Sequence, residues 1–288
     1  MRRIDCPDSN IRGEHFDSLQ EMILTTVQRP LNDAYKADYS AKRPEWVRSG
    51  LMCTWRESMD YLRHGSDLFD GEYAEALRDV RLELARYLSA TAAPRQRFDV
   101  VGGSVSVGRA LAGQPDAFTR RAPQMRRAKA VNLYYSLSCP YGYSTHDRIM
   151  GGCTLMAIVE ALERQGHQAA ITLCATFSFR EDSPAFLAEV MLKDCRTRLN
   201  VKKLQFPLAS TTVLFHLGKW WLHRSPMVTV DLGPGEGQPV DTDPQRLEQA
   251  KAYMASQHGV YLSHVQMKRL GWDIPKVMDY VREQLARQ

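Results

Sequence analysis

The stretch from residue 129 to residue 179 constrains the fold of this chain more than any other. It contains two apolar, strand-like segments, AVNLYYSLS and HQAAITLCATFSF, separated by the helical segment DRIMGGCTLMAIVEALERQG, which Gly166 ends. Two strands joined by a crossover helix run parallel, and the helix packs on one face of the sheet. A parallel sheet buries both of its faces. The pattern therefore predicts a three-layer α/β domain with a mostly parallel sheet.

The alternation of strand and helix continues to the end of the chain. The apolar segments predict further strands at 185–195 and 260–267, and residues 227–237 predict a strand that runs into a glycine-rich loop. Helical spacing or a long apolar run predicts further helices at 208–223, 243–259 and 273–288. Asp273 is placed as the N-cap of the last helix. Residues 129–288 thus make up the predicted α/β domain.

The first 128 residues predict a helical cap that packs on this domain. Apolar residues recur at helical spacing in three segments, at 15–28, 54–65 and 72–90. Gly65 is placed to end the second of these helices. We therefore divide the chain at residue 128.

A glycine-rich stretch between residues 94 and 123 interrupts the helical pattern. Val105 and Val107 alternate with serine, which predicts a short strand or hairpin. The stretch lacks the Gly-Lys-Ser or Gly-Lys-Thr ending of a Walker loop, so turns are favoured over a phosphate cradle. A phosphate-handling enzyme stays an open alternative. The glycines of this stretch are Gly102, Gly103, Gly108 and Gly113.

Composition limits the compartment and the chemistry. No apolar run approaches the roughly 20 residues that a membrane span requires. The first ten residues turn acidic and polar where a signal peptide would be apolar. We therefore expect a cytoplasmic protein that does not bind membranes. The 6 cysteines form no C-x-x-C pair, which favours buried thiols over zinc ligands.

Positive charge is concentrated in two regions, although the formal net charge is only +5. Residues 120–129 carry five basic side chains and no acid, and residues 195–230 contain no Asp or Glu. Regions that carry only positive charge favour the binding of a polyanion such as nucleic acid, or of an acidic protein partner. A solvated face balanced by acids from elsewhere in the fold is the alternative.

The segment KWWLHR adds adjacent tryptophans to the second basic region. A flat ring beside basic residues is the combination that binds single-stranded nucleic acid, because bases stack and phosphates pair. The alternative is that the tryptophans fill the core, although adjacent positions on a helix do not face the same way. The expected binding residues are Arg120, Arg121, Arg126, Arg127, Lys129, Lys202, Lys203, Lys219, Trp220 and Arg224.

The core segments also carry a resemblance to a known fold. The strand ending in x-Ser-x-Ser, the long helix and the next strand resemble the first βαβ unit of the von Willebrand factor A fold, within residues 129–267. Asp231 matches the aspartate that ends a later strand of that fold. There an Asp-x-Ser-x-Ser turn binds a metal ion, whereas here Tyr134 precedes Ser136 and Ser138. Mg²⁺ needs one or two carboxylates, so the resemblance implies a degenerate turn that holds no metal and no other cofactor.

A looser resemblance covers most of the chain. The order of the segments at 54–65 and 100–118, followed by the core, resembles an uncharacterised family found in bacteriophages and mobile elements. That resemblance implies no known activity.

From these patterns we expect a non-catalytic, phage-encoded binding protein. No nucleophile elbow accompanies the serines, so no catalytic residue is assigned. The expected partner is nucleic acid, or a protein that handles it, bound by the basic surface. The alternative is an adaptor that docks partners at the strand ends of a metal-free or weakly metal-binding von Willebrand A-like domain. The sequence leaves the preference for single strands or duplexes and the oligomeric state open.

Overall fold

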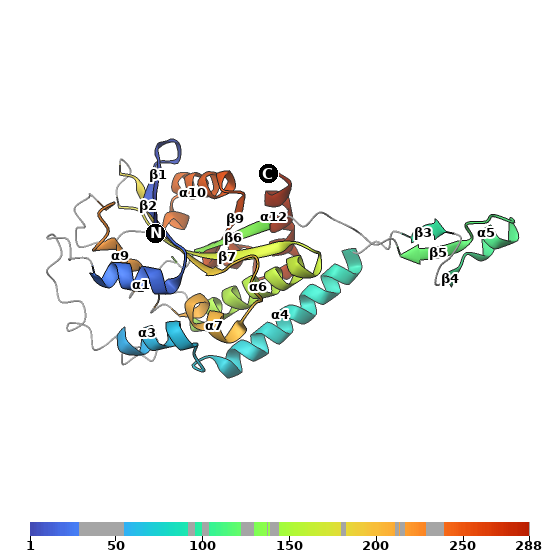
Figure 1. Ribbon diagram of the computed structural model, residues 1–288, viewed down its shortest axis with the longest axis horizontal. Helices are drawn as coiled ribbons and strands as arrows, with labels where there is room; N and C mark the ends of the chain where they lie inside the picture. The colour runs from blue at the N-terminus through green and yellow to red at the C-terminus, as the bar shows by residue number, and fades with distance from the viewer. Residues whose placement is uncertain are drawn as a thin grey trace.

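A six-stranded mixed sheet forms the centre of the protein (Figure 1). The computed structural model describes residues 1–28, 55–91, 96–99, 104–121, 130–136, 138, 144–179, 183–210, 213, 217–228 and 239–287. The strands follow one another across the sheet in the order β1 (Arg2–Cys6), β2 (Ile11–Phe16), β8 (Ala185–Lys193), β7 (Gln168–Phe177), β6 (Ala130–Ser136) and β9 (Gly259–Ser263). The pairs β2–β8, β6–β7 and β6–β9 are parallel, and β1–β2 and β7–β8 are antiparallel. The predicted α/β class and the predominance of parallel pairs are confirmed.

Helices cover both faces of this sheet, so the body has three layers (Figure 1). One face carries α1 (Leu19–Gln28), α6 (Thr145–Arg164), α7 (Val201–Ala209), α9 (Lys219–Leu222) and α12 (Ile274–Ala286). On that side α4 (Asp70–Thr91) packs against α6, and α3 (Trp55–His64) packs against α7. The other face carries η3 (Val240–Thr242) and α10 (Pro244–Ser256). The short elements η1 (Pro7–Ser9) and α11 (His264–Arg269) follow β1 and β9.

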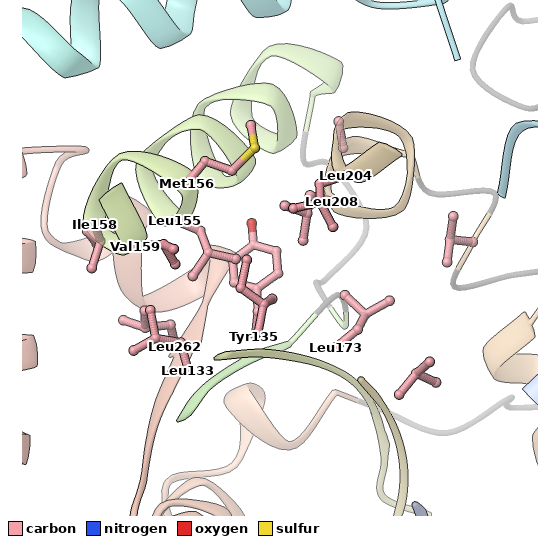
Figure 2. Close-up of a cluster of buried hydrophobic side chains, with 14 of the residues drawn as sticks. Leu133, Tyr135, Leu155, Met156, Ile158, Val159, Leu173, Leu204, Leu208 and Leu262 are labelled. Carbon is pink, nitrogen blue, oxygen red and sulfur yellow. The ribbon is translucent and has the colours of Figure 1, made fainter. Parts of the chain in front are cut away.

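Strand β6 contributes buried side chains to the hydrophobic clusters on both faces of the sheet, because successive side chains of a strand point to opposite faces. Leu133 and Tyr135 lie against Leu155 and Met156 of α6 (Figure 2), whereas Tyr134 lies in the smaller cluster under α10. All five of these side chains are buried. The strand is therefore buried on both sides, as expected for the middle of a parallel sheet.

Local signals set the ends of α6. The Ser144 Oγ accepts a hydrogen bond from the Asp147 backbone N–H (3.1 Å), and the Asp147 carboxylate accepts one from the Ser144 N–H (3.1 Å). This capping box pairs two backbone donors at the helix start. Gly166 ends the helix region with a φ of +86°, which is unfavourable for other residues.

The N-terminal region differs from its prediction. Residues 11–16 form β2 and α1 begins only at Leu19, and the strand β1 precedes them, where only a helix from residue 15 was predicted. The main sheet therefore takes strands from both sides of the predicted division at residue 128. The sequence did not predict β2, because a strand that contains Glu14 and His15 lacks an apolar pattern. Both side chains are nevertheless buried, against polar partners from distant parts of the chain.

Two predicted elements also change in the second half. The helix predicted at 208–223 is not continuous, because α7 ends at Ala209, Ser210 is extended and α9 has only 4 residues. The described end of the strand predicted at 227–237, Met227 and Val228, lies outside any strand, and the rest falls outside the described residues. The strand at β8 and the helices α10 and α12 are confirmed. The strand predicted at 260–267 is confirmed only as far as Ser263, because Ser263 caps the helix α11 that begins at His264.

A second, small sheet lies apart from the body (Figure 1). It has the strand order β3 (Gln96–Asp99), β5 (Phe118–Arg121) and β4 (Ser104–Val105), and α5 (Val107–Leu111) follows β4. Val107 therefore begins a helix, although alternation with Val105 predicted a strand there. We call the described residues 96–99 and 104–121 the arm.

Candidate functional site

Three local interactions give the arm a defined shape. The Ser106 N–H donates to the Ala117 carbonyl (2.7 Å), which joins the start of α5 to the residue before β5. The Arg109 guanidinium pairs with both carboxylate oxygens of Asp116 (2.7 and 2.8 Å) and lowers the pKa of that carboxyl group. Gly113, with φ of +67°, lets the Gln114 N–H reach the Arg109 carbonyl (3.0 Å) and so end the helix.

Two arginine positions lie opposite each other in the two-stranded ribbon formed by β3 and β5. The antiparallel register pairs Arg97 with Arg120, and Gln96 with Arg121. Like charges at directly opposite positions destabilise an antiparallel pair. The predicted binding residue Arg120 therefore lies opposite another arginine position, Arg97, which the sequence did not single out, while Arg121 lies opposite Gln96.

Apolar side chains are exposed at the other end of the arm. The register pairs Val105 with Phe118, and these side chains are 51% and 36% exposed. Val107 and Leu111, four residues apart on one face of α5, are 67% and 84% exposed. No residue of α5 is buried. We call Val105, Val107, Leu111 and Phe118 the apolar tip.

The basic residues predicted on α7 lie at its first turn. Asn200 caps this helix by accepting a hydrogen bond from the Lys203 N–H (3.2 Å). Lys202 and Lys203 are exposed. Lys202 forms an ion pair with Asp67 (2.5 Å), which raises the pKa of the ammonium group. Part of the charge predicted here is thus balanced within the protein.

The adjacent tryptophans of α9 have different environments. Trp221 is fully buried and donates its indole N–H to the buried Glu14 carboxylate (2.7 Å). Trp220 is half-buried, and the Arg224 guanidinium lies 4.0 Å from the centre of its ring. One tryptophan therefore belongs to the core, as their adjacent positions predicted, and the structure brings Trp220 and Arg224 together. Lys219 begins this helix.

The predicted basic residues do not gather on one described element. Those within the described residues are divided among β5, α7 and α9. The remaining predicted residues, Arg126, Arg127, Lys129 and Asp231, lie outside the described residues.

The two serines of the metal-like turn make hydrogen bonds at the end of strand β6. Ser138 Oγ donates to the Thr176 carbonyl (2.9 Å) and accepts from the Thr176 N–H (2.9 Å). Ser136 Oγ accepts from the Ser138 N–H (3.3 Å), and both serines are buried. Tyr134 is buried under α10, which raises the pKa of its hydroxyl. The Ser138 hydroxyl thus continues the pairing of β6 with β7 beyond the end of β6, and the Ser136 hydroxyl holds the backbone of Ser138 in place.

A row of buried polar residues crosses the sheet on the α10 face. The strand registers place His15, Glu189, Cys174, Ser136 and Ser263 directly opposite one another in succession. Each of the five is buried. The sequence reasoning missed this row, and the one local signal is an acid inside the apolar run AFLAEVML.

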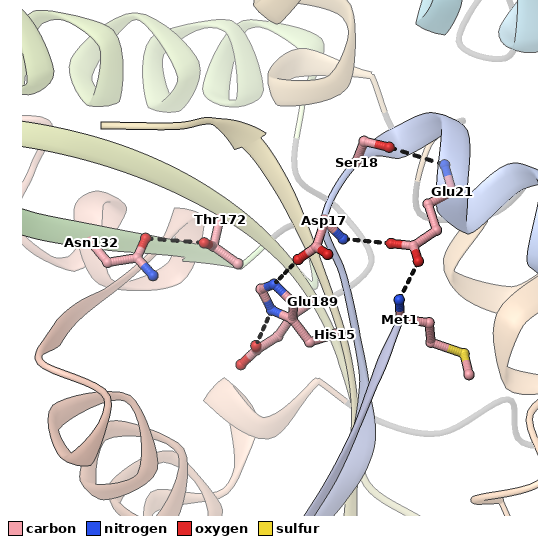
Figure 3. A network of polar contacts seen from close by, with 8 residues as sticks. All are labelled: Met1, His15, Asp17, Ser18, Glu21, Asn132, Thr172 and Glu189. Atoms are coloured by element: carbon pink, nitrogen blue, oxygen red, sulfur yellow. Dashed lines mark hydrogen bonds and ion pairs between the residues drawn. The ribbon is translucent and has the colours of Figure 1, made fainter. Parts of the chain in front are cut away.

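A histidine lies at one end of this row (Figure 3), and a buried aspartate lies beside the other end. His15 Nδ1 lies 3.0 Å from Glu189 Oε2, and its Nε2 lies 3.4 Å from the exposed Asp17 carboxylate. At the β9 end, Asp241 accepts hydrogen bonds from the hydroxyls of Tyr261 (2.8 Å) and Ser263 (2.7 Å). Burial raises the pKa of Asp241. His15, Glu189 and Asp241 are thus buried and each has a polar partner, although the second carboxylate oxygen of Glu189, Oε1, accepts no hydrogen bond from the described residues.

The described residues contain no group of three or more His, Cys, Asp or Glu side chains that could hold a metal ion. Cys153 and Cys174 are buried and unpaired, as predicted for structural thiols. Burial raises the pKa of Cys153 to about 12 and also raises that of Cys174. Both thiols are therefore protonated and unreactive at neutral pH. Cys6 and Cys195 are half-buried, and Cys53 and Cys139 lie outside the described residues.

The fold and the arm define a three-layer, mixed α/β protein that carries a basic ribbon with an apolar end. The chain belongs to the family described as Domain of unknown function (DUF7192), whose model matches residues 5–288. No curated protein and no solved structure matches it. None of the helices described is long and apolar enough to cross a membrane.

Proposed function

We propose that this chain is a non-catalytic binding protein that engages nucleic acid through the arm. The observation that carries the proposal is the register that pairs Arg97 with Arg120. Two cations at opposite positions cost stability unless an anion lies between or above them. The arginine guanidinium matches phosphate oxygens in a bidentate geometry, so a phosphate backbone is the anion that suits this ribbon.

The charge balance of the arm supports a polyanion. Arg109 and Asp116 neutralise each other. Asp99 is then the one acid left among the described arm residues, against Arg97, Arg120 and Arg121. In the register Asp99 pairs with Phe118, away from the arginine positions. The basic sequence continues from Arg121 to residue 129, which extends the same sign of charge.

A second contact at α9 belongs to the same proposal. Arg224 holds the Trp220 ring through a cation–π contact of 4.0 Å, and Lys219 precedes it. Such a ring can stack on an unpaired base. The von Willebrand A-like description of the core also stays a proposal, supported by the parallel β6–α6–β7 unit.

Binding of labelled oligonucleotides, followed by fluorescence anisotropy at about 50 and 200 mM salt, tests this function. Each phosphate contact contributes about −0.9 to the slope of log affinity against log salt, so three contacts predict a loss of roughly 40-fold over this range. The variant Arg97→Glu/Arg120→Glu should remove most of the binding.

A matched control makes the same change of charge on the body. The variant Arg56→Glu/Arg86→Glu reverses two exposed arginines, on α3 and α4, and should bind like the wild type at equal salt. Absence of binding at both salt concentrations would overturn the proposal. An equal loss in the control variant would also overturn it, because the attraction would then come from net charge and not from the arm.

A further inference from the structure

Exposed large apolar side chains gather on the arm, where they form the apolar tip. Four of the eight large apolar residues that are exposed among the described residues lie between 104 and 121. Single exposed apolar residues are ordinary, whereas a group of them marks an interaction surface. Leu111, at 84%, is the most exposed of the eight.

The shape and charge of the arm limit what can cover the tip. In Figure 1 the arm projects from the body and α5 lies at its outer end, so a partner that covers the apolar tip has to be concave. Apart from the Arg109–Asp116 pair, the described arm residues include arginines at positions 97, 120 and 121 and a single acid, Asp99, so an anionic partner suits the arm. An anionic groove fits both the charge and the shape.

The grooves of duplex nucleic acid meet both requirements. Proteins with β-ribbons place their strands in a DNA groove. Proteins that bind the minor groove combine arginine with an apolar side chain that enters between two base pairs and kinks the duplex. Leucine and phenylalanine are among the residues used in this way. The arm carries arginines on β3 and β5 and exposed Leu111 and Phe118 on the same small fold.

From these observations we propose that the arm binds duplex DNA in its minor groove and bends it by inserting the apolar tip between base pairs. This inference rests on the proposed function and adds the form of the nucleic acid and the role of the tip. Leu111 is the inserted side chain, because it is more exposed than Val107, the other large apolar residue of α5, and lies at the last position of that helix. Val107, one turn earlier on the same face, lies against the neighbouring sugar edge.

A wedge has to be held firmly to separate stacked bases. The Arg109–Asp116 ion pair and the hydrogen bond between Ser106 and Ala117 hold α5 against the start of β5. The apolar tip is therefore set in place before it meets DNA, so insertion does not require the tip to fold. The arginines then anchor the two phosphate backbones on either side of the kink.

Energy transfer between dyes at the two ends of a short duplex tests the inference, with anisotropy measured on the same samples. The wild-type protein should bring the dyes closer and raise the transfer efficiency. The variant Leu111→Ser/Val107→Ser should still bind in the anisotropy measurement but lose the change in transfer. The control variant Leu24→Ser/Leu82→Ser, at exposed positions of α1 and α4, should bend DNA like the wild type.

The outcomes separate this inference from the proposed function. Absence of any anisotropy change means that the arm does not bind nucleic acid, so both proposals fail. Binding without a change in transfer by the wild type overturns bending and leaves the function standing. Full bending by the serine variant overturns the role of the tip. A wild-type dimer in sedimentation that the serine variant converts to a monomer would identify a second copy as the occupant, and would overturn the inference as well.

Discussion

Ser138 provides the sharpest test of whether the x-Ser-x-Ser segment is structural. Its buried hydroxyl donates to the Thr176 carbonyl and accepts from the Thr176 N–H, both at 2.9 Å. Strand β6 has ended by this point, since its last pair with β7 joins Ser136 to Cys174. The Ser138 hydroxyl thus replaces the backbone groups of β6 as the hydrogen-bond partner of Thr176 in β7.

The variant Ser138→Ala leaves two buried backbone groups of Thr176 without this partner. Each unpaired group costs about 1 to 3 kcal/mol, so the free energy of unfolding should fall by about 2 to 6 kcal/mol. For a chain of this size, even the lower value corresponds to a decrease of roughly 4 to 8 °C in the melting temperature. A residue that only served a partner or a metal ion at the surface would show no such loss.

Urea unfolding followed by circular dichroism measures this difference. The variant Ser256→Ala is the control, because its hydroxyl donates to the Tyr253 carbonyl at a solvated helix end. That change should cost less than about 1 kcal/mol. A Ser138→Ala protein that unfolds within about 0.5 kcal/mol of the wild type would refute the structural role of the hydroxyl.

Two further predictions concern buried polar contacts. Trp221→Phe removes the indole donor of Glu14 and should lower the free energy of unfolding by about 1.5 to 3 kcal/mol, whereas Trp220→Phe should change it little. Equal losses in urea unfolding would contradict the different burial of the two rings. His264 is buried beside Tyr135, and desolvation lowers its pKa to about 4. In the unfolded protein this histidine has its ordinary pKa of about 6.5 and takes up a proton that the folded protein does not bind until about pH 4. The free energy of unfolding of the wild type should therefore fall by roughly 3 kcal/mol more than that of His264→Gln as the pH drops from 7 to 4. Parallel stability curves for the two proteins over this range would exclude that explanation.

The segments of the main α/β unit follow from short-range patterns. The alternating and continuous apolar runs predicted β6, β7, β8 and β9, and the helical runs predicted α6, α10 and α12. Their ends depend on contacts between residues within four positions of each other. Asp273, for example, accepts a hydrogen bond from the Lys276 N–H (3.1 Å), as its place before the apolar face indicated.

The candidate site was predictable only in part. The run of arginines pointed to Arg120 and Arg121, because sign and density of charge are properties of the sequence itself. The place of Arg97 opposite Arg120 could not be predicted, because it depends on the register between β3 and β5, which are separated by some twenty residues. The exposure of Leu111 could not be predicted from the sequence either, because an apolar residue in a helix is ordinarily covered by other elements.

The sequence by itself determined where the helices and most strands of the core lie, because hydrophobic periodicity and capping act over a few residues. Only the tertiary structure decided that residues 2–16 join the sheet. There Glu14 meets Trp221 and His15 meets Glu189, partners 207 and 174 positions away. It also decided that Ser138 completes the sheet. A polar residue in the sequence looks the same whether it faces water or a buried partner, and only packing between distant segments removes the water and sets its role.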